Sequence, residues 1–330
     1  MKIAIVGVTG LVGRTFLKVL EELNFPVTEL LPVASSSSAG KKIRFNNKEY
    51  KVITVEEALK AKPQIAMFSA GTAVSKEWAP RFASEKCYVI DNSSCWRMNS
   101  EIPLVVPEVN PGDISREKYI IANPNCSTIQ MVVVLQPLHK AFKIKRIVVS
   151  TYQSVTGTGQ KAIEQLESER KGKQCTKVYP HTIDLNCFPQ GGTFLPDGYT
   201  TEEQKLIDET RKIMHEPEML VSPTVVRIPV VGGHSEALNI EFEKPYDIKE
   251  IRKILEASPG IVIQDDPSEN LYPTPLFACN KNEVFVGRIR RDNTLPNGLN
   301  IWIVADNLRK GAATNAVQIA QLLIEKGIVN

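Results

Sequence analysis

Cys126 is the residue in this sequence whose type and position most directly suggest chemistry. It follows a strand-like run, Lys118 to Ala122, and it precedes an apolar segment that predicts a helix from Ser127, with an end or a kink at Pro137. A cysteine in the first turn of a helix lies among backbone N–H groups that favour the thiolate and can bind an oxyanion. A small buried hydrophobic side chain is the alternative interpretation of this stretch alone.

The composition limits the class of protein that carries this thiol. The chain has 330 residues, of which 42% are hydrophobic and 23% charged, so we expect a globular protein of about two domains. The net charge is +3 with acids and bases interspersed, and nothing favours nucleic acid or a membrane as a partner. The six cysteines have neither C-x-x-C nor metal-ligand spacing, so we expect no metal site and a reducing, cytoplasmic setting.

The N-terminus has the pattern of a dinucleotide-binding site. A strand is predicted over Lys2 to Val6, a glycine turn follows, and an amphipathic helix is predicted from Arg14 to Leu23. The turn has the spacing G-x-x-G-x-x-G, and its candidate cofactor contacts are Gly7, Thr9, Gly10, Leu11, Val12 and Gly13. Glycines let the backbone approach a pyrophosphate at a helix N-terminus. A glycine turn without a ligand is the alternative.

A serine-rich segment after the second predicted strand, Val27 to Ala34, bears on the choice of cofactor. It lacks the acidic residue that binds the ribose hydroxyls in NAD-preferring sites. Hydroxyl donors without a nearby carboxylate favour the 2′-phosphate of NADP, and the alternative is a flexible polar loop. The donors available in this segment are Ser35, Ser36, Ser37, Ser38, Lys41 and Lys42.

Strands and helices alternate in the rest of the first half. Strands predicted at Gln64 to Phe68 and at Tyr88 to Ile90 flank a helix from about Ala73 to Glu85, which indicates a doubly wound parallel sheet. We expect Leu104 to Val106 and the strand before Cys126 to extend this sheet, which brings the thiol to its carboxyl edge. Ligands bind at that edge, and the polar and glycine residues expected there include Ser69, Gly71 and Asn92.

Strands dominate the second half of the chain. They are predicted at Lys145 to Gln153, Pro223 to Val230, Glu236 to Glu243, Glu283 to Ile289 and Leu299 to Ala305. This pattern indicates a second, mixed α/β domain with a largely antiparallel sheet, whose open face is available for a partner subunit. Helices are predicted from a Thr200 cap to about Met214 and from Leu308 to Lys326. We expect residues 1–126 with 307–330 to bind the dinucleotide, and residues 127–306 to serve catalysis and dimerisation.

Six stretches, taken in their order and spacing, resemble the aspartate-semialdehyde dehydrogenase family over nearly the whole chain. They are the glycine turn, Asn123-Pro124-Asn125-Cys126, Tyr152 to Gly157, the Glu202 helix, Arg227 to His234, and Asp306 to Ala313. The resemblance implies reversible, NADPH-dependent reductive dephosphorylation of L-aspartyl-4-phosphate to L-aspartate 4-semialdehyde, in lysine, threonine and methionine biosynthesis. It also implies a homodimer or a tetramer. Ser36-Ser37-Ser38 lacks the arginine that many bacterial members have in this loop.

The resemblance also implies a role for each site residue. Cys126 attacks the acyl phosphate and expels phosphate, and the resulting thioester accepts hydride to give a hemithioacetal that collapses to the aldehyde. His234 is the acid–base group, because an imidazole titrates near neutrality, and Gln153 orients the acyl intermediate. Arg227 binds the substrate α-carboxylate and Glu202 the α-ammonium group. The phosphate site corresponds to Arg97, Asn125 and Lys205, and further cofactor contacts to Ser154, Gly157 and Asn307.

Other interpretations stay open at this point. Glu202 and Lys205 have the i, i+3 spacing of a surface ion pair, and Arg227 is also suited to pairing on a strand. N-acetylglutamyl-phosphate reductase and the phosphorylating glyceraldehyde-3-phosphate dehydrogenases share the cysteine-on-a-helix design, and a nucleotide-sensing protein without chemistry is an alternative of another class. Three histidines have no motif around them and are expected to be structural or exposed, namely His139, His181 and His215.

Overall fold

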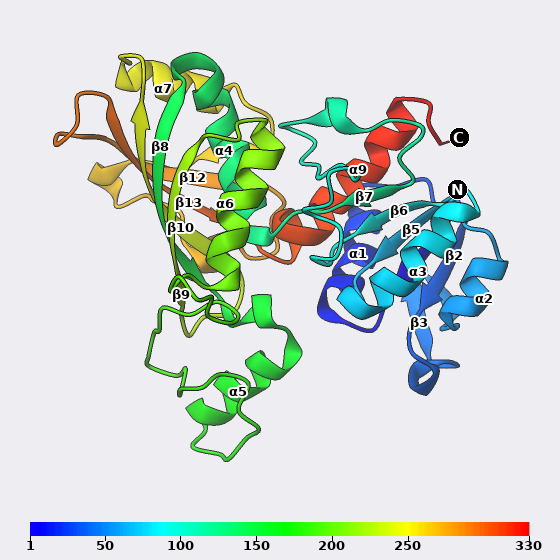
Figure 1. The fold of residues 1–330 in the computed structure, drawn as a ribbon. Helices are drawn as coiled ribbons and strands as arrows, with labels where there is room; N and C mark the ends of the chain where they lie inside the picture. Colours follow the sequence, from blue (N-terminus) through cyan, green and yellow to red (C-terminus); the bar gives the residue numbers. More distant parts are fainter. Residues whose placement is uncertain (330) are drawn as a thin grey trace. The chain divides into compact units, whose positions relative to one another are not determined.

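A five-stranded parallel sheet forms the centre of the first of two units in a computed structural model, which describes residues 1–329 (Figure 1). This unit comprises Met1–Asn125 and the C-terminal residues from Ala312. Every strand pair is parallel, which confirms the predicted doubly wound parallel sheet. In spatial order the strands are β2 (Glu29–Val33), β1 (Lys2–Val6), β5 (Ile65–Phe68), β6 (Tyr88–Asp91) and β7 (Ile120–Ala122).

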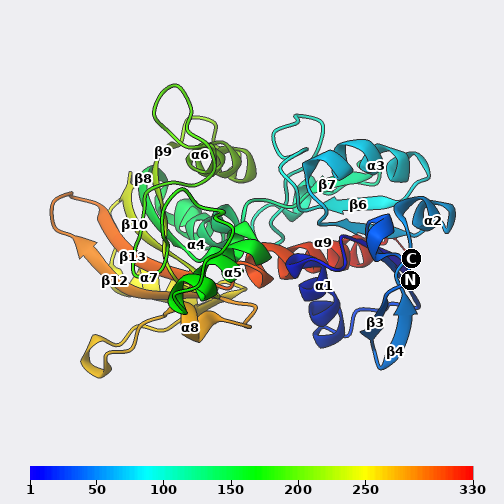
Figure 2. The same ribbon diagram turned by 90° about the horizontal axis from the view of Figure 1, so that it is seen from below.

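Helices cover both faces of this sheet because its strands are apolar on both sides. Ile3 and Ile5 of β1 belong to the core beneath α1 and α9. Ala4 and Val6, which point to the other face, belong to the core beneath α2 and α3. Figure 2 shows α1 and α9 on one side of the sheet and α3 on the other. The helices are α1 (Leu11–Glu22), α2 (Val55–Lys60), α3 (Thr72–Ser84) and α9 (Thr314–Glu325).

Two predicted boundaries in this unit differ from the structure. Helix α1 begins at Leu11 instead of Arg14, so Gly13 lies inside its first turn. A Cβ atom added to Gly13 would lie 2.2 Å from the carbonyl oxygen of Gly7, and only glycine fits so tight a turn. Leu104 forms an isolated bridge with Ala122 instead of starting a further strand.

The serine-rich segment leads into a hairpin that the sequence analysis did not predict. Its strands are β3 (Lys42–Phe45) and β4 (Lys48–Lys51), and they pair antiparallel. Asn46 and Asn47 at the turn both have positive φ, a conformation that asparagine tolerates better than most residues. The serines before the hairpin form the 3₁₀ turns η1 (Ser36–Ser38).

A six-stranded mixed sheet forms the centre of the second unit, Cys126–Gly311. Its inner pairs are antiparallel and its two outermost pairs are parallel, which confirms the predicted mixed, largely antiparallel sheet. In spatial order the strands are β11 (Ile261–Ile263), β12 (Val284–Asp292), β13 (Gly298–Ala305), β10 (His234–Phe242), β8 (Ile144–Gln153) and β9 (Leu220–Arg227).

Helix α4 covers one face of the second unit's sheet. Helix α4 packs against β8, β10 and β13, and α6 packs against α4 and the edge strand β9. The α-helices are α4 (Cys126–Phe142), α5 (Gln160–Arg170), α6 (Thr201–Met214), α7 (Ile248–Glu256) and α8 (Pro275–Ala278). Short 3₁₀ segments are η2 (Pro111–Asp113) in the first unit and η3 (Val155–Thr158) and η4 (Pro267–Glu269) in the second.

Two helix boundaries also differ from the prediction. Helix α4 does not end at Pro137 but continues to Phe142. Leu138 and Phe142 are buried, and this apolar burial outweighs the one helical hydrogen bond that a proline removes. The predicted helix from Leu308 to Lys326 is divided into a π-helical turn, η5 (Arg309–Ala313), and α9.

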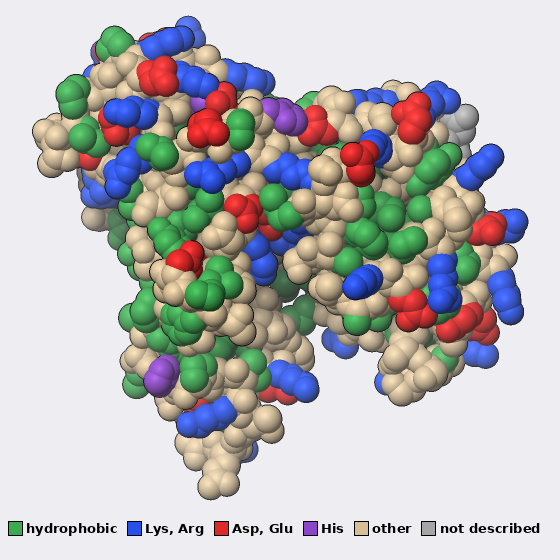
Figure 3. Space-filling view, in the orientation of Figure 1, with side chains coloured by type: hydrophobic (Ala, Val, Ile, Leu, Met, Phe, Trp, Pro, Cys, Tyr) green, Lys and Arg blue, Asp and Glu red, His purple; other side chains and the backbone are tan. Residues whose placement is uncertain are grey.

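Residues 1–329 contain neither a membrane-spanning helix nor a cluster of metal-ligating side chains. No helix there is long and apolar enough to cross a bilayer. In the same residues no three His, Cys, Asp or Glu side chains gather as metal ligands would. Figure 3 shows basic and acidic side chains intermixed on the surface of both units.

Candidate active site

The candidate nucleophile, Cys126, is the first residue of α4. Its side chain is partly exposed, whereas the residues that follow it in the helix are buried against the sheet. The start of the helix is therefore fixed in place while the thiol stays accessible. The partial positive charge of the helix N-terminus stabilises a thiolate at this position.

Gln153 approaches this helix start from the end of β8. Its side-chain Nε2 donates a hydrogen bond to Ser127 Oγ over 3.0 Å, and both side chains are buried. Because the amide nitrogen faces Ser127, the amide oxygen points away from it. Ser127, the residue after Cys126, thus sets the orientation of the Gln153 side-chain amide.

His234 is the first residue of β10, two residues before the predicted start of that strand. Its Nδ1 accepts a hydrogen bond from the backbone N–H of Ser154 over 3.0 Å, so the ring hydrogen of the neutral imidazole is on Nε2. Burial lowers the pKa of His234 to about 3, with a smaller lowering by the charge of Arg227 and an opposing effect of Glu202. The imidazole is therefore neutral near pH 7, and the titration near neutrality that the sequence analysis expected of His234 is not found.

Arg227 ends β9, three residues before the predicted end at Val230. Its Nη1 donates a hydrogen bond to the backbone carbonyl of Ser154 over 2.7 Å. The peptide groups of Ser154 thus hold both Arg227 and His234. Gly157 lies beside them, since a Cβ added there would be 3.0 Å from His234 Nε2 and 3.4 Å from Arg227 Nη1.

The N-terminus of α6 supplies a pair of opposite charges. Lys205 Nζ lies 3.0 Å from Glu202 Oε2, so the ion pair expected from their spacing is present. The neighbouring Glu203 fixes this end of the helix. Its carboxylate accepts a hydrogen bond from the backbone N–H of the N-cap residue Thr200, and a second one from the backbone N–H of Val225 in β9 over 2.9 Å. The helix start is thereby joined to the strand that ends in Arg227.

Ser154 and Asn307, both predicted cofactor contacts, meet in a buried hydrogen-bond network. Ser154 Oγ lies 2.7 Å from the carbonyl oxygen of Gly232 and 3.2 Å from Asn307 Oδ1. The Thr156 hydroxyl donates to the same Asn307 oxygen over 2.8 Å and lies in close contact with Ser154 Oγ. This network fixes the chain just before His234.

The predicted cofactor contacts of the first unit follow the carboxyl ends of its strands. Ser69 Oγ donates to the carbonyl oxygen of Val6 over 3.3 Å, which connects the ends of β5 and β1. Ser35 and Ser37 are exposed, with their hydroxyls 2.9 Å apart. The glycine turn ends in Gly10, the residue before α1, and Gly71 stands before α3. Backbone N–H groups at two helix starts therefore face the same edge of the sheet.

Arg97, which is buried, and Asn92, which is half-buried, form a polar group at the end of β6. Arg97 Nη2 donates to the backbone carbonyl of Asn92 over 2.9 Å, and the Asn92 side chain accepts from Asn123 Nδ2 over 2.7 Å. Arg97 and Asn125 are both largely buried. The positive charge of Arg97 is thus held at the sheet edge, as an anion site in this unit would require.

Three histidines lie outside the candidate site, as expected. His139 is structural, since its Nδ1 accepts the backbone N–H of Ile144 over 3.1 Å and its Nε2 lies 2.9 Å from a Glu216 oxygen. His181 and His215 are exposed.

Glu203 and Glu236 are among the buried acidic residues of the second unit, and neither was predicted to be buried. The capping pattern Thr200 to Glu203 was a usable signal for the first. For Glu236 the only signal was a carboxylate within an otherwise apolar strand pattern.

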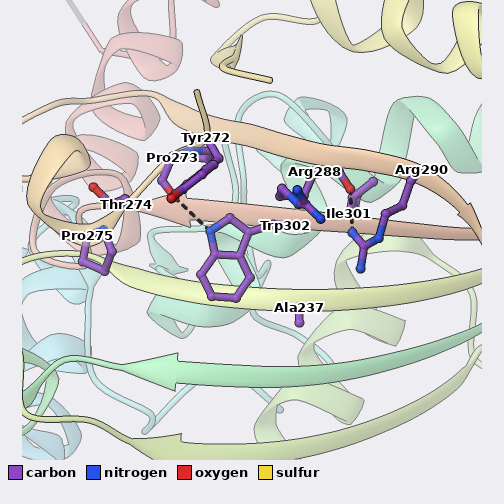
Figure 4. Close-up of a pocket in the computed structure, with 9 residues that line it drawn as sticks. All are labelled: Ala237, Tyr272, Pro273, Thr274, Pro275, Arg288, Arg290, Ile301 and Trp302. Atoms are coloured by element: carbon purple, nitrogen blue, oxygen red, sulfur yellow. Dashed lines mark hydrogen bonds between the residues drawn. The ribbon is translucent and has the colours of Figure 1, made fainter. Parts of the chain in front are cut away.

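A separate pocket of ≈ 460 Å³ lies on the other face of the second unit's sheet (Figure 4). Ala237 and Trp302 are directly opposed across β10 and β13, and Ala237 points away from the face that carries His234. Trp302 Nε1 donates to the carbonyl oxygen of Pro273 over 2.9 Å. Near this pocket Leu276 is 86% exposed and Tyr272 44% exposed, so an apolar surface is uncovered there.

Comparisons with known proteins agree over both units. Residues 2–117 match the family model for the semialdehyde dehydrogenase NAD binding domain, and residues 135–310 match that for the semialdehyde dehydrogenase dimerisation domain. An aspartate-semialdehyde dehydrogenase of Aquifex aeolicus is 54% identical over 99% of this chain and 99% of that protein. One of Legionella pneumophila is 50% identical, over 98% of this chain and 95% of that protein.

A solved structure has the same fold over nearly its whole length. The crystal structure of aspartate semialdehyde dehydrogenase II complexed with ASA from Vibrio cholerae has a TM-score of 0.95 and 47% identity, with 98% of each chain covered. Since both sequence and fold match throughout, the chain belongs to the aspartate-semialdehyde dehydrogenase family of oxidoreductases, with that family's NAD(P)-binding and dimerisation domains.

Proposed function

We propose that this oxidoreductase reduces L-aspartyl-4-phosphate to L-aspartate 4-semialdehyde, reversibly, through a thioester on Cys126. The observation that carries this mechanism is the convergence at the end of β8. Gln153 contacts the start of the helix that bears the thiol, and the next residue, Ser154, orients His234 and Arg227 through its own backbone. A nucleophile, a hydrogen-bond donor and an anion-binding group are thereby assembled around one strand end.

The charges of the site favour an amino acid substrate. Arg227 offers a planar fork for the α-carboxylate, and Glu202 offers a negative charge for the α-ammonium group. The substrate of an N-acetylglutamyl-phosphate reductase has an uncharged acetamido group at this position, and glyceraldehyde 3-phosphate has no ammonium group at all. Lys205, Arg97 and Asn125 are the proposed phosphate ligands.

The proposed chemistry follows from the protonation states of these groups. The Cys126 thiolate attacks the acyl carbon, the bond to the phosphate oxygen breaks, and phosphate leaves the thioester behind. His234, with its hydrogen on Nε2, donates to the acyl oxygen as negative charge develops there. Once hydride has reached the acyl carbon, the resulting alkoxide expels Cys126 as a thiolate and the aldehyde is released.

The first unit has the features that fit NADP. The tight turn at Gly13 lets the backbone of the glycine turn approach a pyrophosphate, and Ser35 to Ser37 offer exposed hydroxyls without a carboxylate among them. NADPH supplies the hydride when it is bound. We assign cofactor binding to the first unit and catalysis to the second. The six cysteines are present as thiols, which suits a reducing cytoplasm.

An assay with three substrates tests this function. We expect NADP reduction with aspartate semialdehyde plus phosphate, and rates at least ~10²-fold lower with N-acetylglutamate semialdehyde or glyceraldehyde 3-phosphate, because Glu202 then loses its charged partner.

The Cys126→Ala variant tests the covalent mechanism. It should abolish turnover but leave NADP affinity within about three-fold, since the thiol forms a bond to the substrate only. Mass spectrometry of the parent should detect an acyl adduct on Cys126. Appreciable turnover by Cys126→Ala would contradict the covalent mechanism.

The His234→Asn variant should slow turnover by ~10²–10⁴, the usual contribution of a positioned proton donor. It should also change how stability depends on pH. The pKa of His234 is about 3 in the folded chain, so between that pH and its ordinary value near 6.5 the unfolded chain binds a proton that the folded chain does not. The stability of the parent is therefore complete above about pH 6.5 and falls as the pH drops below it.

Urea unfolding at about pH 7.5 and about pH 4.5 measures this effect. From about pH 7.5 to about pH 4.5, the free energy of unfolding should fall more in the parent than in His234→Asn. His215→Asn is the matched control, because His215 is exposed and its left-handed conformation suits asparagine. Equal losses in the parent and in His234→Asn would show that His234 is not buried in the neutral form.

Cofactor choice is tested at the serine turn. Ser36→Asp or Ser37→Asp should shift the ratio of kcat/KM from NADP towards NAD, because a carboxylate repels the 2′-phosphate and accepts a hydrogen bond from the free ribose hydroxyl. The parent should prefer NADP by a few kcal/mol or less, given ~1.5–3 kcal/mol for a hydrogen bond to a charged group. Ser84→Asp, at the C-terminal end of α3, is the control. An unchanged ratio of kcat/KM in both Ser36→Asp and Ser37→Asp would show that the serine turn does not contact the 2′-phosphate.

We further propose a homodimer formed through the sheet face that carries the apolar surface near Trp302. An uncovered apolar surface of this kind is typical of a subunit interface. Leu276→Arg should weaken self-association by about ten-fold or more, whereas Leu185→Arg, at another exposed leucine of the same unit, should not. Light scattering over a dilution series measures this, and it also separates a dimer from a tetramer. A monomeric parent at all concentrations would contradict the proposal.

A further inference from the structure

The guanidinium group of Arg227 is buried without a carboxylate partner. The side chain is 6% exposed, and among residues 1–329 it forms no ion pair. Its Nη1 donates to the Ser154 carbonyl, while its Nε, also buried, has no hydrogen-bond partner in the same residues. A buried cation costs free energy unless its charge is compensated. The Nε edge of the fork is thus open to an anion, as the proposed binding of the substrate α-carboxylate requires.

The aromatic ring of Tyr179 compensates part of this charge. The Arg227 Cζ atom lies 5.7 Å from the centroid of the Tyr179 ring, within the range of a cation–π interaction. Tyr179 is itself buried, and such an interaction is stronger where water is excluded. A carboxylate partner would occupy the N–H groups of the fork. An aromatic ring attracts the cation through its π electrons and leaves those N–H groups available for a ligand.

Tyr179 is held at its hydroxyl, its backbone and its ring. The hydroxyl donates to Thr158 Oγ1 over 2.8 Å, and the backbone N–H donates to Gln165 Oε1 in α5 over 3.1 Å. The ring packs edge-on against Phe188, with centroids 5.4 Å apart. Phe188 in turn pairs with Arg227 through an isolated antiparallel bridge. The segment that carries the Tyr179 ring is therefore joined to the residue that the ring contacts.

We infer that Tyr179 is a positioning residue whose ring holds the Arg227 guanidinium in place and leaves its Nε edge open to the substrate α-carboxylate. This inference rests on the function proposed above, which assigns that carboxylate to Arg227. Ser154 fixes one nitrogen of the guanidinium, and the Tyr179 ring supplies a second contact that stops the group from turning about Nη1. A fork that is held in its binding orientation before substrate arrives binds a carboxylate more tightly than a mobile one does.

Loss of the ring should weaken binding of the substrate that carries the carboxylate. We expect Tyr179→Leu to raise KM for aspartate semialdehyde by about ten-fold, the size of a cation–π interaction shielded from water. The value of kcat should stay within about three-fold, because the α-carboxylate has the same charge in the ground state and in the transition state. KM for phosphate and KM for NADP should also stay within about three-fold, since neither ligand is assigned to Arg227. An unchanged KM for aspartate semialdehyde would overturn the inference.

Two variants separate the effect of the ring from those of the hydroxyl and of packing. Tyr179→Phe removes the hydrogen bond to Thr158 and keeps the ring, so KM for aspartate semialdehyde should stay within about three-fold of the parent. Leu166→Val shortens another side chain of the hydrophobic cluster that contains Tyr179, and it should lower the free energy of unfolding without changing this KM. If KM rises as much in either of these variants as in Tyr179→Leu, the inference is wrong.

A double-mutant cycle tests the connection to Arg227. In an Arg227→Gln background the ring has no cation to hold, so Tyr179→Leu should cause no further loss of kcat/KM for aspartate semialdehyde. Losses that add in the double variant would show that Tyr179 does not act through Arg227.

A change in the charge distribution of the ring replaces Tyr179→Leu if that variant fails to fold. Tyr179→pentafluorophenylalanine nearly keeps the shape of Tyr179→Phe, but the fluorine atoms reverse the ring quadrupole that attracts a cation. KM for aspartate semialdehyde should be about ten-fold higher in the fluorinated variant than in Tyr179→Phe. Equal KM values in these two variants would contradict a cation–π role.

The outcomes also distinguish this inference from the proposed function. If the parent and all variants are inactive with aspartate semialdehyde, phosphate and NADP, the proposed function fails and the inference fails with it. If the parent is active, Cys126→Ala is inactive and Tyr179→Leu has the KM values of the parent, the function stands and the inference alone is overturned.

Discussion

The arrangement of the candidate site depends on the two peptide groups of Ser154. The N–H fixes Nδ1 of His234 and the C=O fixes Nη1 of Arg227. Backbone groups at the end of a sheet strand have little freedom to rotate, so they define direction more sharply than a mobile side chain would. The same contact settles the tautomer of the imidazole, because a nitrogen that accepts from an N–H group cannot carry the ring hydrogen.

Burial then determines which groups of the site are charged. His234 is fully buried, and burial lowers its pKa to about 3, so the imidazole of the site is neutral near pH 7. Arg227 keeps its charge, because a guanidinium does not lose its proton in proteins. In surroundings of low dielectric constant, oriented donors act more strongly on a developing negative charge than they would in water. Neutral donors and one fixed cation thus suit chemistry at an acyl oxygen.

Local patterns in the sequence predicted the parts of the structure that local physics controls. The apolar run of β1, the glycine turn and the start of α4 near Cys126 follow from periodicity and turn chemistry. The helix end predicted as one possibility at Pro137 does not occur, because the local effect of the proline is outweighed by the burial of Leu138 and Phe142. The Ser154 contacts with His234 and Arg227 could not be predicted, since they depend on which strands become neighbours and in what register. No property of a single segment encodes that register.

Under the proposed roles, the ion pair between Glu202 and Lys205 can be exchanged for two contacts with the substrate. Before substrate binds, each charge satisfies the other over 3.0 Å at the start of α6. An α-ammonium group at Glu202 and a phosphate at Lys205 would each supply a new opposite charge, so the pair can be exchanged for two contacts with substrate. Neither side chain then passes through an unpaired state, which limits the cost of removing water from these charges. A ligand with only one of the two charged groups leaves one partner unmatched, and selectivity for the doubly charged substrate follows from that imbalance.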